Sequence, residues 1–446
     1  MSLNSCLNNI RNFINTPSSE KQEKGIFRVT VVTFEDRCNL NCGRRFADLL
    51  SNNKLFEVNF YDEAFPKGFL NLQGRNFFDF IDQGKRILEK NHSDVIVWGY
   101  EENGKIRVNF QTPEQYTINQ ELSFSLLDSL FIPLSYFSDT DKFSASLLLL
   151  IYGIIIAATK TVTNEQKENK PKLLQNILKL LADDTSHKEL AREFMPFIMN
   201  MLGKVYLNSV YDNLTDKDVE IIENLLSGAL KNNQYLRMPV YYGCIYNNLG
   251  QLYETAGKRG GDNSFDYLKL SIKNYRLAQK YLEGNFPYDF GLIAYHLAEL
   301  HFAFWKHTGD IQALRDAVAK LREAENIYTF VQFPHSWCKI EGLLGYYLTN
   351  LGMKTRSNDI MLLAINSYHN QQKVYEQIIY PQEWASIQDE IGNIYYLLGK
   401  QNDDDNFMYE ARNYFNSAID IYSKIKNKKA QKQVEQRLAK VKNYIG

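Results

Sequence analysis

Apolar and polar positions follow a long repeating pattern in the C-terminal half of this 446-residue chain. Each copy opens at a proline, with an aromatic residue three positions later, and successive prolines are 48, 47 and 47 residues apart: Pro239, Pro287, Pro334 and Pro381. Two more series keep the same register, the small residues Gly250, Ala298, Gly345 and Gly392 and the tyrosines Tyr281, Tyr328, Tyr375 and Tyr422. A fixed period of this length predicts stacked copies of one supersecondary unit.

Each copy contains two apolar stripes with helical spacing. In the last copy the first stripe runs in steps of three and four, through Trp384, Ile387, Ile391, Ile394 and Leu398. Proline suits the first turn of a helix, so it is predicted to begin each first helix. Gly399 is predicted to end that helix by taking the positive φ that follows it. Gly392 and its counterparts are expected to let the paired helices approach closely. In the second copy, Ala298 and Trp305 replace glycines, which predicts a different turn there.

A different pattern precedes the repeats. The segments 26–34, 55–62, 95–100 and 105–111 are rich in β-branched and aromatic residues, as strands are. Segments 44–50 and 75–91 have helical apolar spacing, and Asn103-Gly104 is a hairpin signal. The order is β-α-β-α-β-β, so the whole chain is predicted to be α+β, with a small α/β domain before an all-α solenoid.

The remaining segments are assigned by their apolar content. Gln120 to Lys160 is predicted to form apolar helices, Lys160 to Lys172 a surface loop, and Lys170 to Asp183 an amphipathic helix. Residues 192–213 and 216–232 are predicted to be a degenerate first repeat, because Gly203 precedes Gly250 by 47 positions. The predicted segments are a polar, disordered 1–24, the α/β domain 25–118, connecting helices 119–187, repeats 188–424, and a C-terminal helix 425–446. That last helix is either a cap or a basic docking surface.

Two resemblances to known families follow from these residues. The motif LG-x-x-Y at Leu249–Tyr253, with LLG-x-x-L and EIG-x-x-Y in later copies, resembles the tetratricopeptide repeat, in a long-period form common in bacterial proteins. This resemblance covers Lys188 to the C-terminus, and it implies a superhelical solenoid that binds peptides or helices of other proteins. Residues 29–50 and 93–100 resemble the N-terminal domain of the translocation protein TolB. No β-propeller or export signal is evident, so the translocation role does not transfer.

Composition narrows the function classes. The formal net charge is −1, so there is no electrostatic case for nucleic-acid binding. The five cysteines are scattered and odd in number, which favours reduced thiols and a cytoplasmic location. Residues 143–158 are apolar but shorter than the roughly 20 residues that span a bilayer, so a buried core helix is expected, with membrane association as the alternative.

No residue pattern indicates an enzyme, a cofactor or a metal site. Phosphate-binding and nucleophile-elbow motifs are absent, and the glycines of 257–262 lie in an inter-helix loop. Cys38 and Cys42 lack a second ligand pair, and His296 and His301 are five residues apart, a spacing that does not share a helix face. The acidic run 403–405 lacks the spacing of a calcium loop.

The expected function is therefore a non-enzymatic scaffold or adaptor that binds a protein partner, with the α/β domain as a second docking module. The residues expected to be exposed on the first helices, as carboxamide clamps on a peptide or as solvated positions, are Asn247, Asn248, Gln251, His296, Glu299, Tyr346, Asn350, Gln388 and Asn393. One alternative is a ligand-gated module in which Arg37, Arg44 and Arg45 hold an anion or instead form internal ion pairs. A structural subunit of an oligomer or larger complex is the other.

Overall fold

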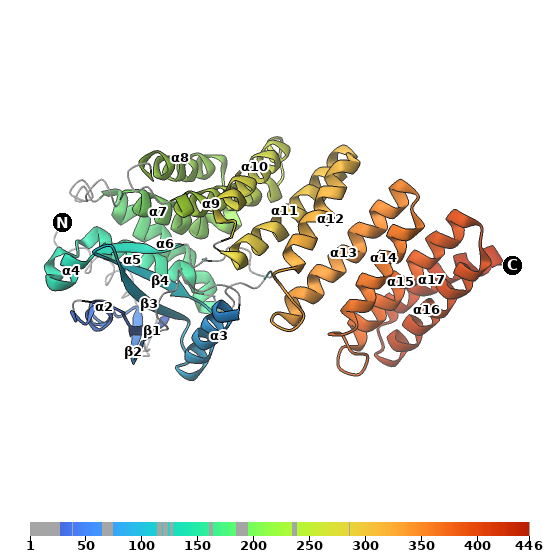
Figure 1. The fold of residues 1–446 in the computed structure, drawn as a ribbon, viewed down its shortest axis with the longest axis horizontal. Helices are drawn as coiled ribbons and strands as arrows, with labels where there is room; N and C mark the ends of the chain where they lie inside the picture. Colours follow the sequence, from blue (N-terminus) through green and yellow to red (C-terminus); the bar gives the residue numbers. More distant parts are fainter. Residues whose placement is uncertain are drawn as a thin grey trace. The chain divides into compact units, whose positions relative to one another are not determined.

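A computed structural model describes residues 27–37, 39–64, 75–113, 118, 124, 128–159, 164–183, 195–233, 239–284 and 286–445. The fold is α+β, as predicted: a five-stranded sheet with its helices is followed by helices that pack in pairs (Figure 1). The chain divides into two compact units, an N-terminal unit of residues 1–289 and a C-terminal unit of residues 290–446.

The sheet of the N-terminal unit has the order β2-β1-β3-β4-β5. Strands β1 (Phe27–Thr33), β2 (Phe56–Ala64) and β3 (Val95–Glu102) are parallel, and β4 (Lys105–Gln111) and β5 (Leu130–Pro133) are antiparallel additions. Asn103 and Gly104 both have positive φ and form the predicted hairpin turn. The predicted order of strands and helices along the chain, β-α-β-α-β-β, is confirmed as far as β4. The prediction of helix at 130–133 is wrong, because four consecutive apolar residues carry no period that separates a strand from a helix.

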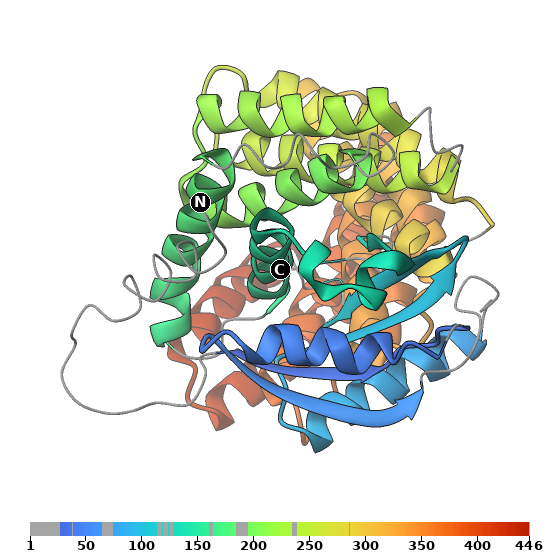
Figure 2. The same cartoon turned by 90° about the vertical axis from the view of Figure 1, so that its left-hand side faces the viewer.

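Helices cover this sheet and continue its core. Helix α2 (Cys42–Ser51) packs against β1 and β2 (Figure 2), and α3 (Arg75–Lys90) contacts β3. Gly43 permits the close approach of α2, since a Cβ there would lie 2.7 Å from the amide nitrogen of Phe34. The apolar helix α5 (Ala145–Ala158) is buried in the same core, as expected. Within the described residues no helix has the length and apolar character needed to cross a membrane.

The predicted surface loop 160–172 is largely wrong, because helix α6 (Asn164–Asp183) already includes its residues from 164 onward. Lys170 lies inside this helix, and its ammonium donates hydrogen bonds to the carbonyl oxygens of Ala157 and Thr159, at 2.9 and 2.7 Å. These are the carbonyls that the C-terminus of α5 leaves without helical partners. Burial lowers the pKa of Lys170 to about 8.

The N-terminal unit ends in two antiparallel helix pairs. The first pair is α7 (Met195–Val210) with α8 (Asp216–Asn233), and the second is α9 (Pro239–Lys258) with α10 (Ser264–Leu282). The predicted pairing across Gly203 is confirmed, since a Cβ on that residue would lie 2.8 Å from the side chain of Leu226. The short elements of this unit are α4 (Leu134–Ser138), η2 (Thr140–Lys142) and η4 (Tyr211–Asn213).

The C-terminal unit consists of helices alone within its described residues, 290–445. Its helices are α11 (Pro287–Thr308, which begins in the preceding unit), α12 (Ile311–Glu325), α13 (Pro334–Thr355), α14 (Asn358–Gln371), α15 (Pro381–Asn402), α16 (Asp405–Lys424) and α17 (Lys428–Ile445). Successive helices from α12 to α17 pack against each other (Figure 1). Val434, Leu438 and Val441 of α17 are buried with α16, so this helix covers the last pair.

The predicted period is visible in individual contacts of this unit. The amides of Trp337 and Trp384 donate to the carbonyls of Phe333 and Tyr380, at 2.8 and 2.9 Å. The ring pair Tyr328–Phe333 has centroids 5.2 Å apart and an interplanar angle of 68°. The equivalent pair Tyr375–Tyr380 lies at 5.4 Å and 69°. The two tryptophans therefore occupy equivalent places in neighbouring repeats.

The turns inside each repeat are equivalent too. Gly309, Arg356 and Asp403 all have positive φ, and their amides bond to the carbonyls four residues earlier. The predicted role of Gly399 is therefore wrong. It lies within α15, where a Cβ on it would lie 3.0 Å from the side chain of Met408, and Asp403 takes the left-handed position. The different turn predicted for the second copy is wrong as well, because Gly309 takes that position there. Each following helix is capped by a side chain, that of Asp310, Ser357 or Asp404.

Candidate binding site

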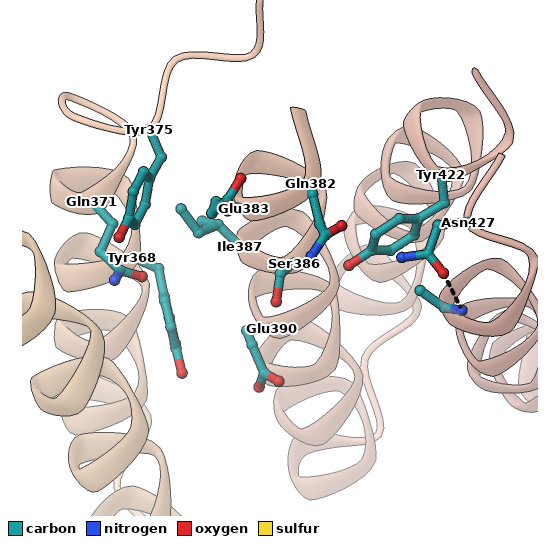
Figure 3. Close-up of a pocket in the computed structure, with 11 residues that line it drawn as sticks. Tyr368, Gln371, Tyr375, Gln382, Glu383, Ser386, Ile387, Glu390, Tyr422 and Asn427 are labelled. Carbon is teal, nitrogen blue, oxygen red and sulfur yellow. Dashed lines mark hydrogen bonds between the residues drawn. The ribbon is translucent and has the colours of Figure 1, made fainter. Parts of the chain in front are cut away.

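A cavity of about 380 Å³ lies in the C-terminal unit, between α14 and α15 and toward the start of α17 (Figure 3). Its size is within the range of small-ligand sites in proteins. The lining comes from α14 and the turn after it, from the first three turns of α15, and from the α16–α17 junction. The lining residues are Tyr368, Gln371, Tyr375, Gln382, Glu383, Ser386, Ile387, Glu390, Tyr422, Asn427 and Ala430.

Helix α15 places two carboxylates along this cavity. Glu383 and Glu390 are seven residues apart, which is two helical turns, so both lie on one side of the helix (Figure 3). The pKa of Glu390 is raised by burial and by the neighbouring carboxylate of Asp389. Arg437 is the nearby cation, but its guanidinium donates to Asp389 at 2.8 Å. The lining itself contains no lysine or arginine.

Some of the polar groups in the lining already have partners in the chain. Gln371 donates to the carbonyl of Cys338 at 2.9 Å, and Asn427 accepts from the amide of Ala430 at 3.2 Å. Tyr422 is hydrogen-bonded to Ser386. These contacts fix the walls of the cavity and leave other lining groups to meet a guest.

Tyr368 is one of the groups that remain. Its side chain is only 5% exposed, and its hydroxyl makes no hydrogen bond with any described residue. Burial raises the pKa of Tyr368, and the charge of Glu390 raises it further. Likewise, Glu383 and Glu390 form no ion pair within the described chain. Glu383 is exposed and Glu390 is half-buried, so water meets their carboxylates, and a ligand with complementary groups would replace that water.

The sequence-based prediction missed this cavity because it selected only positions expected to be exposed on the first helices. A signal for the cavity was present in the order of polar residues: Glu383, Ser386 and Glu390 form a polar stripe at helical spacing beside the apolar one. The partners of that stripe, Tyr368 and Tyr375, come from the preceding helix and turn. Their approach depends on tertiary packing, which the stripe alone does not reveal.

Two of the three predicted partner-binding residues of the N-terminal unit are buried. Asn248 and Gln251 are only 1% and 4% exposed, so the expectation that they are accessible is wrong. The side chain of Asn248 donates to Asp128 and Asn200, at 3.0 Å each. The ammonium of Lys204 donates to the carboxamide oxygens of Asn248 and Gln251. The physical reason is the buried pair of Lys204 and Asp128, 3.6 Å apart, whose charges need these amides as partners.

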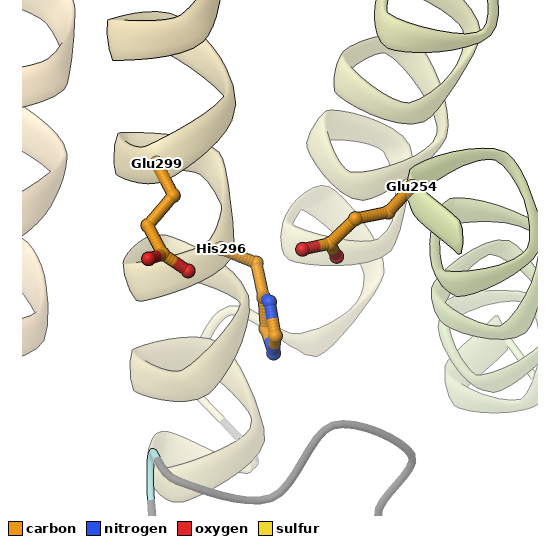
Figure 4. Close-up of side chains that lie close together, drawn as sticks. All are labelled: Glu254, His296 and Glu299. Atoms are coloured by element: carbon orange, nitrogen blue, oxygen red, sulfur yellow. The ribbon is translucent and has the colours of Figure 1, made fainter. Parts of the chain in front are cut away.

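The other predicted residues are spread over several helices. His296 and Gln388 are also buried, contrary to expectation, whereas Tyr346 is exposed and Asn247, Glu299, Asn350 and Asn393 are half-buried. The side chain of Asn350 donates to the carbonyl of Tyr346 on its own helix. His296 and Glu299 project from neighbouring turns of α11 (Figure 4). Glu254 of α9, drawn in the same figure, accepts hydrogen bonds from Tyr275 and Lys258.

The predicted anion loop is organised by its own carboxylate. Asp36 accepts from the amides of Leu40 and Cys42, at 2.8 and 3.0 Å, and so occupies the N-terminus of α2, where an anion would bind. Arg45 donates to the carbonyls of Leu40 and Phe137, and Arg44 lies over the ring of Phe60 at 4.8 Å. The backbone amide of Arg37 donates to Glu101. Cys38, the partner proposed for Cys42, lies outside the described residues.

No known protein family matches the chain, and no curated protein matches it. The pairwise-packed helices of the C-terminal unit and the equivalent contacts of neighbouring copies are compatible with a helical-repeat architecture.

Proposed function

We propose that this protein is a non-enzymatic scaffold that binds a segment of a protein partner in the cavity between α14, α15 and α17. The hydroxyl of Tyr368, which lines a cavity that also presents Glu383 and Glu390 and bonds to no described residue, carries the proposal. Helical repeats commonly use such inter-helix surfaces to hold peptides or partner helices. The hydrogen-bonding and charged groups of the lining would contact the bound segment.

The proposal extends to the type of repeat. We assign the helix pairs to the tetratricopeptide type with a lengthened period, supported by the close-approach glycines Gly345 and Gly392 and by the prolines that begin each first helix. The α/β part is proposed to be a second docking module of TolB N-terminal type, with β2 at one end of the strand order as the place where a partner strand adds. A reducing, cytoplasmic compartment fits the free thiols Cys42, Cys244 and Cys338.

Filling the cavity tests the scaffold proposal. Ser386 is an exposed member of the lining, so Ser386→Trp places an indole in the cavity without entering the core. We expect affinity capture from the source cells, read by quantitative mass spectrometry, to lose at least one partner with this variant. Glu410→Gln, an exposed change on α16 outside the cavity, is the matched control and should retain that partner. Identical partner sets for both variants and the parent chain would exclude binding in this cavity.

A second candidate, a structural subunit of a larger assembly, is favoured by one observation. Val331 and Ile378 occupy equivalent turns, 47 residues apart, and are 86% and 93% exposed. Large exposed aliphatic side chains at the tips of turns are typical of interaction surfaces. If the chain is such a subunit, size exclusion with light scattering on native extracts should show a complex that Val331→Ser with Ile378→Ser reduces in mass. Elution of the native chain at the monomer mass would rule this candidate out.

A further inference from the structure

The cavity of the C-terminal unit has two levels along α15 (Figure 3). At the level near the start of the helix, Glu383 lies with Tyr375. At the deeper level, Glu390 lies with Tyr368. Electrostatic coupling pairs the same groups, since the charge of Glu383 acts on Tyr375 and that of Glu390 acts on Tyr368. Each level therefore combines one carboxylate with one tyrosine ring.

This combination is suited to a cation. A carboxylate gives a charge-assisted hydrogen bond to an ammonium or guanidinium group, and a tyrosine ring attracts the same group through its π face. No lysine or arginine in the lining neutralises the two carboxylates, and Arg437 is held by Asp389. The hydroxyl of the largely buried Tyr368 adds a hydrogen-bond acceptor that no described residue uses. A cationic guest would satisfy all of these groups at once.

The distance between the two levels indicates which extended backbone conformation of a bound peptide would reach both carboxylates. Seven residues of α-helix advance by about 10.5 Å, which separates the attachment points of Glu383 and Glu390. In a polyproline II segment, residues i and i+3 lie on the same face and are about 9.3 Å apart. In a β-strand, positions i and i+3 face opposite sides, and i and i+2 are only about 6.6 Å apart. Of these two extended conformations, polyproline II matches the spacing of the two levels better.

We propose that the cavity binds an extended partner segment with two basic side chains three residues apart, one on Glu383 and one on Glu390. This inference rests on the proposed scaffold function and names the chemistry of the segment. The segment lies along α15, with its two cationic groups directed between α14 and α15. The tyrosines stack on the cations, and Tyr368 accepts a hydrogen bond from the deeper one.

Labelled peptides and the full-length chain test this directly by fluorescence anisotropy. The probe is Pro-Arg-Pro-Pro-Arg-Pro, and its controls are Pro-Arg-Arg-Pro-Pro-Pro, with adjacent arginines, and Pro-Arg-Pro-Pro-Ala-Pro, with one. The probe is expected to bind at least tenfold more tightly than either control. Glu383→Gln and Glu390→Gln should each weaken it about tenfold, because each removes one charge-assisted hydrogen bond. Tyr368→Phe should weaken it about fivefold, and Glu410→Gln should leave it unchanged.

Failure of this inference is distinguishable from failure of the scaffold proposal. Equal binding of the three peptides, or equal binding by the parent chain and both Glu→Gln variants, would overturn the two-cation assignment. If Ser386→Trp abolishes partner capture while Glu383→Gln with Glu390→Gln preserves it, the cavity binds a segment of other chemistry. If Ser386→Trp preserves capture and the probe also fails to bind, both proposals are wrong. Far-UV circular dichroism and thermal unfolding of each variant establish that it is folded.

Discussion

Gly392 shows how a single missing side chain sets the distance between two helices. A Cβ at this position would lie 2.8 Å from the ring of Phe415 and 3.3 Å from the carbonyl oxygen of Ala411. Gly345 stands in the same relation to Tyr368 one repeat earlier, at 2.7 Å. The small residues that recur in the sequence thus mark the places where the two helices of each repeat approach closely. Because Tyr368 also lines the cavity, the packing at Gly345 positions a residue of the proposed site.

Gly392→Ala is expected to destabilise the protein by about 1–3 kcal/mol, the usual cost of overpacking a core. The Phe415 ring is buried and the nearby carbonyl is backbone, so neither moves away cheaply. Urea unfolding followed by circular dichroism measures this cost. Gly257→Ala is the control: its nearest neighbour would lie at an ordinary 3.4 Å, and alanine is the better helix former, so it should be neutral or stabilising. A Gly392→Ala variant as stable as the parent would contradict the packing role.

Glu341 gives the C-terminal unit a pH dependence. Burial, with the nearby carboxylate of Glu325, raises the pKa of Glu341 from 4.5 to about 7. The folded state then binds this proton more tightly than the unfolded state. Its contribution to stability is fully present below pH 4.5 and is lost as the pH rises through about 7.

Replacing Glu341 with Gln should therefore stabilise the protein increasingly as the pH rises. The stability difference between Glu341→Gln and the parent is expected to grow from about pH 4.5 to about pH 8, because the parent loses the contribution of its raised carboxyl pKa over this range. Urea unfolding at several pH values measures it, with Glu376→Gln, a change of an exposed glutamate in a turn, as the control. A difference that stays constant across this range would show that Glu341 titrates normally.

At the scale of elements, the turn inside each repeat depends on a residue in the left-handed conformation. Gly309, Arg356 and Asp403 hold this position in three successive repeats, with φ values of 75°, 52° and 54°. Glycine adopts this conformation without cost, whereas other L-residues lose about 1–2 kcal/mol. The turn geometry is therefore retained where the sequence does not supply the preferred residue.

Arg356→Gly should stabilise the protein by about 1 kcal/mol, because it removes the left-handed strain, and Gly309→Ala should destabilise it by a similar amount. Both values come from denaturant unfolding. Inside a helix, the same arginine-to-glycine change should lower stability instead of raising it, because glycine is a poor helix former. The exposed Arg315→Gly on α12 is therefore the control. If Arg356→Gly destabilises the protein, the repeated turn does not have the proposed energetic basis.

A buried polar network connects the segment before β5 with helices α7 and α9 of the N-terminal unit. Asp128 and Lys204 are both fully buried, and Asn200, Asn248 and Gln251 complete their hydrogen bonds. A buried charge without its partner costs several kcal/mol. The network therefore makes the relative placement of these elements specific.

Lys204→Met alone is expected to cost about 3–5 kcal/mol, because it leaves the charge of Asp128 buried and uncompensated. Lys204→Met with Asp128→Asn should cost less than the sum of the two single changes by about 2 kcal/mol. A thermodynamic cycle from urea unfolding gives the coupling. The exposed pair Lys424–Asp420 is the control and should show a coupling below about 1 kcal/mol. Additive costs at Lys204 and Asp128 would mean that the two charges act independently.

The sequence revealed those features that have a period, and it missed those that depend on packing between segments. The repeat spacing correctly predicted that prolines begin the first helices, that glycines lie where paired helices approach closely, and that the helices pack in pairs. The Asn103-Gly104 dipeptide correctly predicted the β-hairpin turn. It could not distinguish Gly399, a packing glycine inside a helix, from a terminating glycine, because both stand near the end of an apolar stripe. Asn248 was expected at the surface because nothing in its own helix indicates that Asp128, 120 residues earlier, meets it.

At the scale of the whole molecule, the chain consists of two compact units with different architectures. The N-terminal unit has one continuous core that joins β1, β3 and β4 to α5, α6 and α7, so the boundary expected near residue 118 falls within it. The C-terminal unit carries the clearest repeats and the proposed cavity. Since the repeats stack with their neighbours, a ligand held between two of them stabilises both. Binding is therefore expected to be detectable as local protection in the C-terminal unit.

Hydrogen–deuterium exchange of the full-length chain, with and without its captured partner, tests the scaffold account most directly. The account predicts increased protection in residues 368–390 and 422–430, the segments that line the cavity, and loss of that protection in the Ser386→Trp variant. Protection confined to other parts of the chain, or unchanged by Ser386→Trp, would contradict it.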